Sequence, residues 1–295
     1  MRLGIGLPHY GAHADPSGIA AFAAHAEKVG YDSLWVGDRV LTPLEPSDLY
    51  PGGTPERPYP PQFTRYFDPL VALTVAATAT ERIRLGSSTL IGTLHTPVLL
   101  ARTLTSIDLV SRGRLDVGLG IGWMRSEYAA AGVPWAARGR RLDELMDALV
   151  AMWTGDPVAH DGPLWHIPPS RVDLRPVQRP HPPLLLGAQT DAALERVGRK
   201  ADGWLPAGRP FDVMARQWDV IRAAAERAGR DPGVLRRILR LNPRPGTTLT
   251  DVATQLSAAR EAGIEEAFVD LHFITGDVAE ATDRADELFA MAAGF

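Results

Sequence analysis

The chain has 295 residues, of which 45% are hydrophobic, and a formal net charge of -4 at pH 7. A chain of this length can bury a large core, and we expect one barrel-sized domain over residues 1–295. The mildly acidic balance provides no basic stripe, so we expect neither nucleic acid nor an anionic membrane surface as a partner. Cysteine is absent, which excludes disulfides, thiolate metal sites and cysteine nucleophiles.

The amino-terminal sequence MRLGIGLP turns polar and helical too soon for a signal peptide. No apolar run approaches the length of a membrane span. Together these features predict a soluble cytoplasmic protein.

Apolar runs bounded by turn residues recur along the chain and are typical of strands buried on both faces. Segments with one apolar face lie between them, and Asp15, Asp68 and Thr96 each precede a proline, which predicts polar caps at helix starts. The expected strands are Arg2–Leu7, Ser33–Gly37, Ile83–Ile91, Leu115–Gly120, Pro183–Gly187, Gly203–Pro206, Ile238–Asn242 and Ala267–Leu271. The expected helices have apolar faces within 19–29 and 142–153, or cover Pro69–Ala79, Pro97–Val110, Thr190–Lys200, Phe211–Ala228, Thr250–Ala262 and Val278–Ala292.

Strict alternation of eight strands with eight helices favours an α/β protein with a closed (β/α)₈ TIM barrel, because right-handed parallel crossovers place the helices outside. An open doubly wound sheet is the alternative. Two proline-rich segments are too long for ordinary loops. Val40–Phe67 follows the second strand and so belongs to the catalytic face. Gly155–Pro182 is an insertion before the fifth strand that enters from the opposite face, and we assign it a structural role first.

Barrel enzymes keep their chemistry at the carboxyl ends of the strands. These ends show no convincing metal-ligand set, nucleophile elbow or serine triad. What they offer is a glycine-lined, aromatic-rimmed mouth, which suits a bound cofactor that carries the chemistry itself. The candidates there are His9, Tyr10, Asp38, Arg39, Ser88–Gly92, Gly118–Trp123, Gly187–Thr190, Asn242 and His272.

The fourth expected strand ends in alternating glycines, Gly118, Gly120 and Gly122, followed by Trp123. Glycines in this position allow the backbone to approach a ligand without a Cβ in the way. The order of strand, glycine-rich exit and helix is typical of sites for phosphate-bearing cofactors. A tight turn whose glycines serve packing only is the alternative.

Five segments resemble the bacterial luciferase-like family of flavin- and deazaflavin-dependent oxidoreductases, and most closely its branch that uses coenzyme F420. The resemblance runs over nearly the whole chain. The segments are AEKVGYDSLWVGDRV at 26–40, YFDPLVALTVAATATERIRLGSS at 66–88, GLGIGWMRSEYAAAGVPWAARGRRLDELMDAL at 118–149, QRPHPPLLLGA at 178–188 and ADGWLP at 201–206.

The resemblance implies that Asp38 hydrogen-bonds the deazaflavin ring, although from its position alone it could cap the loop that follows. It also implies a cis peptide between Ser88 and Thr89, behind the central ring of the cofactor, where the sequence alone favours an ordinary trans strand end. His95, by contrast, is a doubtful functional residue, because the family commonly shows Arg-His-Pro where this chain has His-Thr-Pro.

Two positions depart from deazaflavin dehydrogenases of the family. Arg39 stands where some of them place a catalytic histidine, and because arginine stays protonated it can orient an anionic or carbonyl substrate but cannot shuttle protons near neutral pH. Trp123 stands where sugar-phosphate dehydrogenases of this type carry an acidic glutamate, which argues against that reaction.

The segment Gly187, Ala188, Gln189 and Thr190 opens a helix, where free backbone N–H groups and the Thr190 hydroxyl offer a phosphate site. Thr190 or Asp191 acting only as a helix cap is the alternative.

The substrate-binding candidates are His9, Tyr10, Arg39 and His272. His9 and Tyr10 are expected to wall the substrate cavity, or else to form a polar pair that seals the barrel mouth.

The sequence therefore predicts an oxidoreductase in which F420 exchanges hydride with a small organic substrate held under the Val40–Phe67 loop. An FMN-dependent monooxygenase that uses oxygen is the alternative. It is less favoured because an arginine often follows the fourth-strand glycines in the flavin branch, and this chain has Ile121, Gly122 and Trp123 there. A barrel that has lost its cofactor and acts as a binding protein is a third possibility. A homodimer is implied by the resemblance alone.

Overall fold

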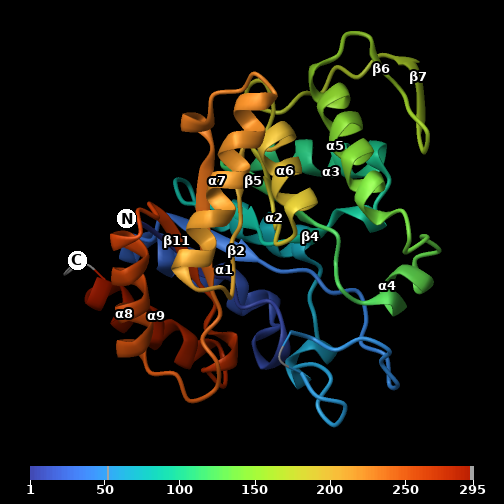
Figure 1. The fold of residues 1–295 in the computed structure, drawn as a ribbon. Coiled ribbons are helices and arrows are strands. Elements are labelled where there is room, and N and C mark those ends of the chain that lie inside the picture. The colour runs from blue at the N-terminus through green and yellow to red at the C-terminus, as the bar shows by residue number, and fades with distance from the viewer. Residues whose placement is uncertain (52, 293–295) are drawn as a thin grey trace.

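Eight parallel strands close into a barrel in the computed structural model, which describes residues 1–51 and 53–292 (Figure 1). Residue 52, inside the expected Val40–Phe67 loop, and residues 293–295 lie outside the described part. The ring closes where β1 pairs with β11 and β3 pairs with β5, so the open doubly wound sheet is wrong. The barrel strands are β1 (Arg2–Gly6), β2 (Ser33–Val36), β3 (Arg84–Ser87), β5 (Leu115–Gly120), β8 (Leu184–Leu186), β9 (Gly203–Trp204), β10 (Arg236–Leu241) and β11 (Glu266–Val269).

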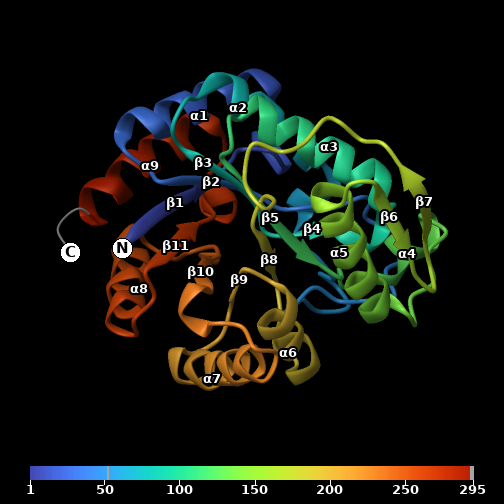
Figure 2. The same ribbon diagram turned by 90° about the horizontal axis from the view of Figure 1, so that it is seen from above.

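The helices surround the ring of strands, as the view from above shows (Figure 2). Their apolar faces pack on the outward side chains of the strands to form the main core. They are α1 (Pro16–Val29), α2 (Pro69–Ala79), α3 (Pro97–Val110), α4 (Arg125–Ala130), α5 (Arg138–Thr154), α6 (Asp191–Lys200), α7 (Phe211–Arg227), α8 (Leu249–Glu261) and α9 (Val278–Ala292).

The predicted polar caps are confirmed at two of three helix starts. The Asp15 carboxylate accepts from the backbone N of Ser17, and Asp68 does the same for the first turn of α2. Thr96 occupies the cap position of α3, as predicted, but its side chain makes no capping hydrogen bond. The prediction of a polar cap was therefore wrong for this helix. Proline at the first position of α3 removes one of the amides that would otherwise need a partner.

The third expected strand, Ile83–Ile91, is interrupted. β3 ends at Ser87, and a two-residue strand, β4 (Leu90–Ile91), follows and pairs with β5. The peptide between Ser88 and Thr89 is cis, which confirms what the resemblance implied. The break places Ser88 and Thr89 at the carboxyl end of the barrel.

The Gly155–Pro182 insertion contains an antiparallel hairpin that the sequence analysis did not predict: β6 (Val158–Asp161) and β7 (His166–Ser170). Glu144 of α5 holds it by accepting hydrogen bonds from the backbone N atoms of Leu164 and Trp165 at 2.9 and 2.8 Å. Figure 1 shows the hairpin at one end of α5 and α4 at the other. The hairpin thus lies away from the segment that carries α4.

Glycines and two large rings fill the inside of the barrel together. Trp35 and Phe268 stack there with ring centroids 4.8 Å apart. A Cβ at Gly86 would overlap the Trp35 ring, and one at Gly4 would lie 2.9 Å from its Nε1. Small residues on neighbouring strands are therefore what allow the indole to occupy the barrel axis.

A buried charge network closes the amino end of the barrel. Asp116 is fully buried and accepts hydrogen bonds from Arg84 at 2.9 Å and Arg236 at 2.7 Å. Arg236 also binds Glu266 at 2.8 Å. Burial would raise the pKa of Asp116, but the two arginines outweigh it and lower that pKa. The four charged side chains are paired with one another, which is typical of a buried network with a structural role.

Candidate active site at the carboxyl end of the barrel

The Asp38 carboxylate joins two strand ends. Its Oδ2 accepts from the backbone N of Ile91 in β4 at 2.8 Å. Burial raises the pKa of Asp38 above its ordinary value, against the lowering effect of this hydrogen bond. The side chain therefore fastens the end of β2 to the segment after β3, which is a different element from the loop that Asp38 would cap in the alternative interpretation.

Arg39 forms a buried ion pair with Glu127 of α4. Nη1 of Arg39 lies 3.1 Å from Oε2 of Glu127, and the two side chains are only 6% and 1% exposed. Neither of these atoms makes a hydrogen bond among the described residues, so the contact is electrostatic with imperfect geometry. The other carboxylate oxygen of Glu127 accepts from the backbone N of Val40 at 2.8 Å. Burial raises the pKa of Glu127, opposed by Arg39.

Aromatic rings from distant segments gather around this pair. The guanidinium carbon of Arg39 lies 4.6 Å from the centroid of Trp123 and 5.5 Å from that of Phe63. Tyr50 contacts both of these rings edge-on, at 5.6 and 5.2 Å. We define the aromatic cluster as Tyr10, Tyr50, Phe63, Tyr66, Trp123 and Phe273, which are linked by edge-on, stacked or tilted ring contacts.

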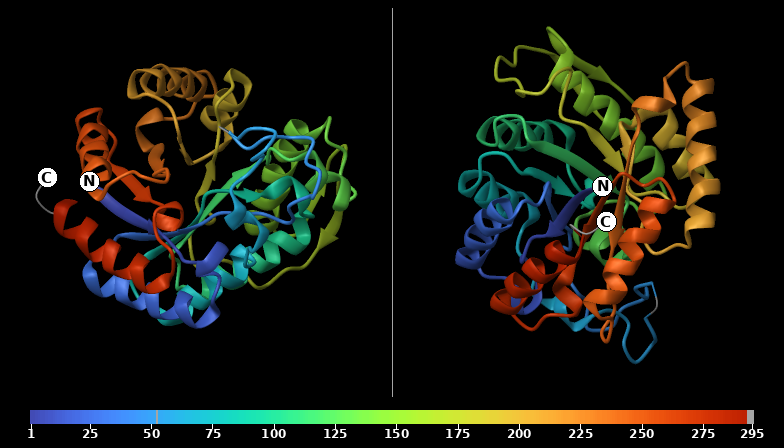
Figure 3. Two further views of the ribbon diagram at one scale, coloured as in Figure 1. Left: turned by 90° about the horizontal axis from the view of Figure 1, so that it is seen from below. Right: turned by 90° about the vertical axis from the view of Figure 1, so that its left-hand side faces the viewer.

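The segment after β2 carries three rings of this cluster over the barrel mouth. In the left-hand view of Figure 3 this segment is drawn in blue and passes beside the green helices α4 and α5. Asp48 fixes it there by accepting from Arg125 of α4, with Nη1 and Oδ1 2.6 Å apart. Below it, a Cβ at Gly37 would come within 2.6 Å of the Tyr66 hydroxyl, so Tyr66 covers the end of β2 closely. The Val40–Phe67 loop therefore lies over the predicted site.

His9, Tyr10 and His272, the expected substrate contacts, form one buried group. Tyr10 stacks on His272 at 3.8 Å and donates its hydroxyl to Asp270 at 3.1 Å. His272 Nδ1 bonds the same carboxylate, and its Nε2 accepts from the backbone N of His9 at 3.3 Å. Nε2 of His9 accepts from the backbone N of Gly37 at 3.0 Å. The structure brings the predicted residues together as a sealed polar group.

The charge state of this group follows from its burial. Burial, with repulsion from His272 next, lowers the pKa of His9 to about 3, so this imidazole is neutral at pH 7. Burial would raise the pKa of Asp270, but His272 and Arg240 outweigh it and hold that pKa well below its usual range. Asp270 is therefore a carboxylate. Burial opposes the charge of Arg240, yet Asp270 raises its pKa further above the ordinary value.

The glycines after β5 have different neighbours. A Cβ at Gly118 would overlap the carbonyl oxygen of Ser87, so this glycine is required by strand packing. Gly120 faces the Thr89 side chain, and a Cβ at Gly187 would lie 3.2 Å from Thr89 Cγ2. Gly122 has φ +66°, in the left-handed region that favours glycine. Packing explains Gly118, Gly120 and Gly187 leave room for the Thr89 side chain, and Gly122 lies beside Ile91 in a backbone conformation that favours glycine.

The start of α6 is open. Gly187, Gln189 and Thr190 are exposed, while Ala188 is buried and its carbonyl accepts from Trp204 Nε1 at 3.0 Å. Thr190 is in the cap position but its side chain makes no capping hydrogen bond. Its hydroxyl and the first amides of α6 thus stay available to a ligand.

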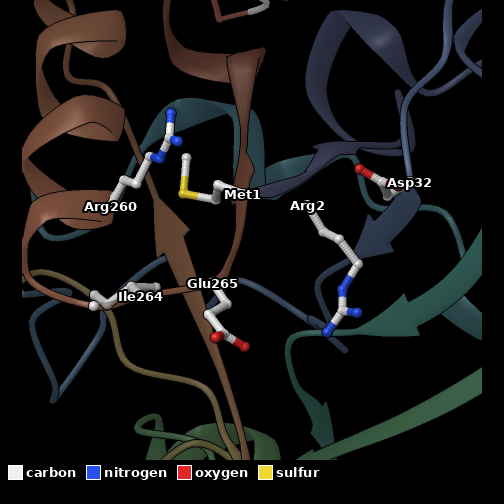
Figure 4. Close-up of a pocket in the computed structure, with 7 residues that line it drawn as sticks. Met1, Arg2, Asp32, Arg260, Ile264 and Glu265 are labelled. Carbon is white, nitrogen blue, oxygen red and sulfur yellow. The ribbon is translucent and has the colours of Figure 1, made fainter. Parts of the chain in front are cut away.

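A hollow of about 580 Å³ lies at the other end of the barrel (Figure 4). Figure 4 shows Met1, Arg2, Asp32 and Glu265 around it, near the beginnings of β1 and β11. These positions are at the amino ends of the strands, opposite to Asp38 and Arg39. Barrel enzymes do not use that end for chemistry, so we do not assign the hollow to the active site.

Within residues 1–51 and 53–292, no group of three or more His, Cys, Asp or Glu side chains could hold a metal ion. Over the same residues, none of the helices combines the length and hydrophobicity needed to cross a bilayer.

Sequence reasoning missed four residues of this region: Tyr66, Glu127, Arg240 and Asp270. Arg240 and Asp270 could have been found from the sequence. Charged residues that stand among apolar residues at the end of a barrel strand, and face the inside of the barrel, are unusual. Glu127 gave no such signal, since a glutamate on a short helix is ordinarily solvated. Tyr66 lies at the end of a long loop whose path over the mouth the sequence does not specify.

The model of a family described as luciferase-like monooxygenase matches residues 2–290 of the chain. An uncharacterised protein of Mycobacterium tuberculosis is 32% identical over 250 residues, which are 84% of each chain. An FMNH2-dependent dimethylsulfone monooxygenase of Pseudomonas putida is 32% identical over 154 residues, covering 51% of this chain and 42% of the relative.

Solved structures share the fold. A monooxygenase, RslO1 from Streptomyces bottropensis, superposes with a TM-score of 0.81 at 20% identity and 98% coverage of both chains. An F420-dependent secondary alcohol dehydrogenase, solved with an F420-acetone adduct, superposes with a TM-score of 0.78 at 15% identity, covering 99% of this chain and 98% of the other. At these identities the similarity establishes the barrel and leaves the cofactor and substrate undetermined.

Proposed function

The chain belongs to the luciferase-like monooxygenase family, and we propose that it is an oxidoreductase that uses coenzyme F420 for hydride transfer with a small organic substrate. F420 is a deazaflavin, and when bound it would supply the hydride chemistry. The protein then has to position the cofactor, orient the substrate and exclude water.

The residues at the mouth fit a flat ring with a phosphate-bearing tail. Gly120 and Gly187 leave the rim beside Thr89 without side chains. Asp38 presents a partly buried carboxyl close to this rim, with a raised pKa that suits a hydrogen bond to a ring polar atom. Thr190 and the open amides of α6 suit the phosphate.

The arginine arrangement after β5 is the observation that carries the choice of F420 over FMN. The segment that follows the glycines places Trp123 on Arg39, and the next arginine, Arg125, is engaged by Asp48 at 2.6 Å. The phosphate monoester of FMN carries a charge near -2. A phosphodiester, such as that of F420, carries -1 and needs less cationic support, which open helix amides can give.

Arg39 is the residue that we assign to substrate orientation. Its guanidinium is held against Trp123 and Phe63, and it stays protonated. It can donate a hydrogen bond to a carbonyl or hydroxyl oxygen, and because it cannot take up a proton it is not a general base.

The flavin alternative rests on a specific similarity, to the FMNH2-dependent monooxygenase of Pseudomonas putida. Titration of the purified protein with F420 and with FMN, followed by tryptophan quenching and by cofactor absorbance, separates the two. We expect tighter binding of F420. Submicromolar binding of FMN without binding of F420 would overturn the proposal in favour of the flavin enzyme, and binding of neither cofactor would favour a barrel that has lost its cofactor.

We also propose a homodimer as the functional unit, as the family resemblance implies. Sedimentation velocity at micromolar concentration tests this, with a single species of twice the chain mass as the expected result.

A further inference from the structure

The aromatic cluster and the charges beside it define what kind of substrate this mouth accepts. Resting on the proposed oxidoreductase function, we infer that the substrate is an uncharged molecule with a flat, aromatic or otherwise apolar body, whose hydroxyl or carbonyl oxygen accepts a hydrogen bond from Arg39. Three observations lead to this class: the rings, the pairing of the charges, and the unsatisfied guanidinium nitrogen.

The rings supply a non-polar wall. Tyr10 and Phe63 are buried, whereas Tyr50, Tyr66 and Trp123 are partly exposed and present their faces and edges at the mouth. Ring pairs in this cluster meet edge-on, stacked or tilted at 4.8–6.2 Å, the geometry in which another flat ring can be added favourably. An apolar planar body gains most from such surroundings.

The charges at the mouth are already neutralised. Arg39 lies 3.1 Å from Glu127, and Arg240 lies 2.8 Å from Asp270. Asp38 is a third carboxyl, and it is near no unpaired arginine of this set. An anionic substrate would therefore add negative charge to a desolvated region that holds no excess positive charge, which is strongly unfavourable.

Arg39 nevertheless keeps unmet donors. No nitrogen of its guanidinium makes a hydrogen bond among the described residues, although Nη1 lies 3.1 Å from Glu127 Oε2 and the charge is balanced. A neutral acceptor oxygen satisfies such a donor without altering the charge balance. The guanidinium of Arg39 thus favours a substrate that carries a hydrogen-bond acceptor. Because Glu127 already balances the charge of Arg39, a neutral acceptor is favoured over an anionic one.

The inference is tested with three small probes: acetophenone, benzoate and cyclohexyl methyl ketone. Acetophenone and benzoate share a ring but differ in charge, and the two ketones share a carbonyl but differ in aromaticity. Binding is measured by ligand-observed NMR titration of the full chain in the presence of F420. We expect acetophenone to bind at least ten-fold more tightly than benzoate, and several-fold more tightly than the saturated ketone.

Glu127→Gln is the decisive variant. The amide keeps an acceptor for the backbone N of Val40 but leaves the charge of Arg39 unbalanced. We expect the ratio of acetophenone to benzoate affinity to fall at least ten-fold. Glu144→Gln is the matched control, because Glu144 is also buried and also accepts from backbone amides, which are those of Leu164 and Trp165 in the β6–β7 hairpin. The control ratio should equal that of the parent.

Benzoate binding as tight as acetophenone binding in the parent protein would overturn the inference, as would an unchanged ratio in a folded Glu127→Gln protein. If that variant does not fold, Trp123→Leu takes its place and should lower the ratio of acetophenone to cyclohexyl methyl ketone affinity several-fold, because it removes a ring of the non-polar wall; an unchanged ratio would count against the inference. F420 absorbance is recorded on the same samples. Loss of F420 binding with the neutral preference retained contradicts the proposed function alone, and F420 binding with a preference for benzoate contradicts this inference alone.

Discussion

Arg240 of β10 and Asp270, which follows β11, face each other inside the barrel with Nη2 2.8 Å from Oδ2. Arg240 also donates to the carbonyl oxygen of Ser88, and Asp270 also accepts from Tyr10 and His272. One ion pair thus connects the ends of three strands beneath the aromatic cluster. The pair is satisfied by several hydrogen bonds on each side, the condition under which a buried ion pair is tolerated.

Asp270→Asn is expected to lower the free energy of unfolding by about 3–5 kcal/mol, because it leaves the Arg240 charge buried without its counter-charge. Urea denaturation at pH 7 measures the effect. The double variant Arg240→Met with Asp270→Leu removes both charges and should lose clearly less than the sum of the losses of Arg240→Met and Asp270→Leu measured singly. Additive losses would show that the two side chains do not act as a pair.

His9 is expected to make the protein less stable in mild acid. Its pKa is about 3 in the folded chain and near 6.5 when unfolded, so below pH 6.5 the unfolded state binds the extra proton. The free energy of unfolding should therefore fall as the pH drops from about 6.5 towards 3, with a slope of up to about 1.4 kcal/mol per pH unit from this group. Urea midpoints between pH 7.5 and 5 measure the slope. A His9→Asn variant should be less pH-dependent than the parent over that range; an identical slope would exclude His9 as the source.

Asp38 is expected to have two separable roles. In Asp38→Ala the buried backbone N of Ile91 loses its acceptor, which should cost about 1–3 kcal/mol of stability. F420 affinity should fall as well, if the carboxyl also contacts the ring. Asp38→Asn retains an acceptor for Ile91, so it should keep most of the stability and isolate the effect on F420. Thermal melting paired with F420 titration measures both. Full F420 affinity in both variants would remove Asp38 from the cofactor site.

The strands and helices of the barrel were predictable because they depend on local patterns. The apolar run Leu115–Gly120 and the helices Pro69–Ala79, Pro97–Val110 and Val278–Ala292 have the bounds that the sequence indicates. The β6–β7 hairpin was not predictable in the same way. Its second strand contains Pro168 and Pro169, which lower the strand propensity of an exposed hairpin, and its position depends on Glu144 of a distant helix.

The candidate site was only partly predictable for a related reason. The sequence places Asp38, Arg39 and His272 at strand ends, because strand ends can be located by counting. It does not show that Arg39 meets Glu127, 88 positions later, or that Tyr66 returns over Gly37. Such pairings are set by the path of the Val40–Phe67 loop and by tertiary packing, which no local pattern encodes.

Gly118 and Gly122 are expected to respond differently to the same added methyl group. A Cβ at Gly118 would overlap the Ser87 carbonyl, and backbone cannot move aside cheaply, so Gly118→Ala should be strongly destabilised or fail to fold. Gly122 lies at the rim with φ +66°, and a Cβ there would be 3.0 Å from Ile91 Cγ2. Gly122→Ala should therefore fold with a loss of about 1–2 kcal/mol from the left-handed backbone. If the rim approaches the cofactor, this variant should also bind F420 more weakly than the parent after correction for the folded fraction.

Gly132→Ala is the matched control, because Gly132 has φ +67° and a Cβ there would meet no atom within 4 Å. It should show a similar backbone cost with the F420 affinity of the parent protein. Unchanged F420 affinity in a well-folded Gly122→Ala protein would limit the glycine exit of β5 to a packing role.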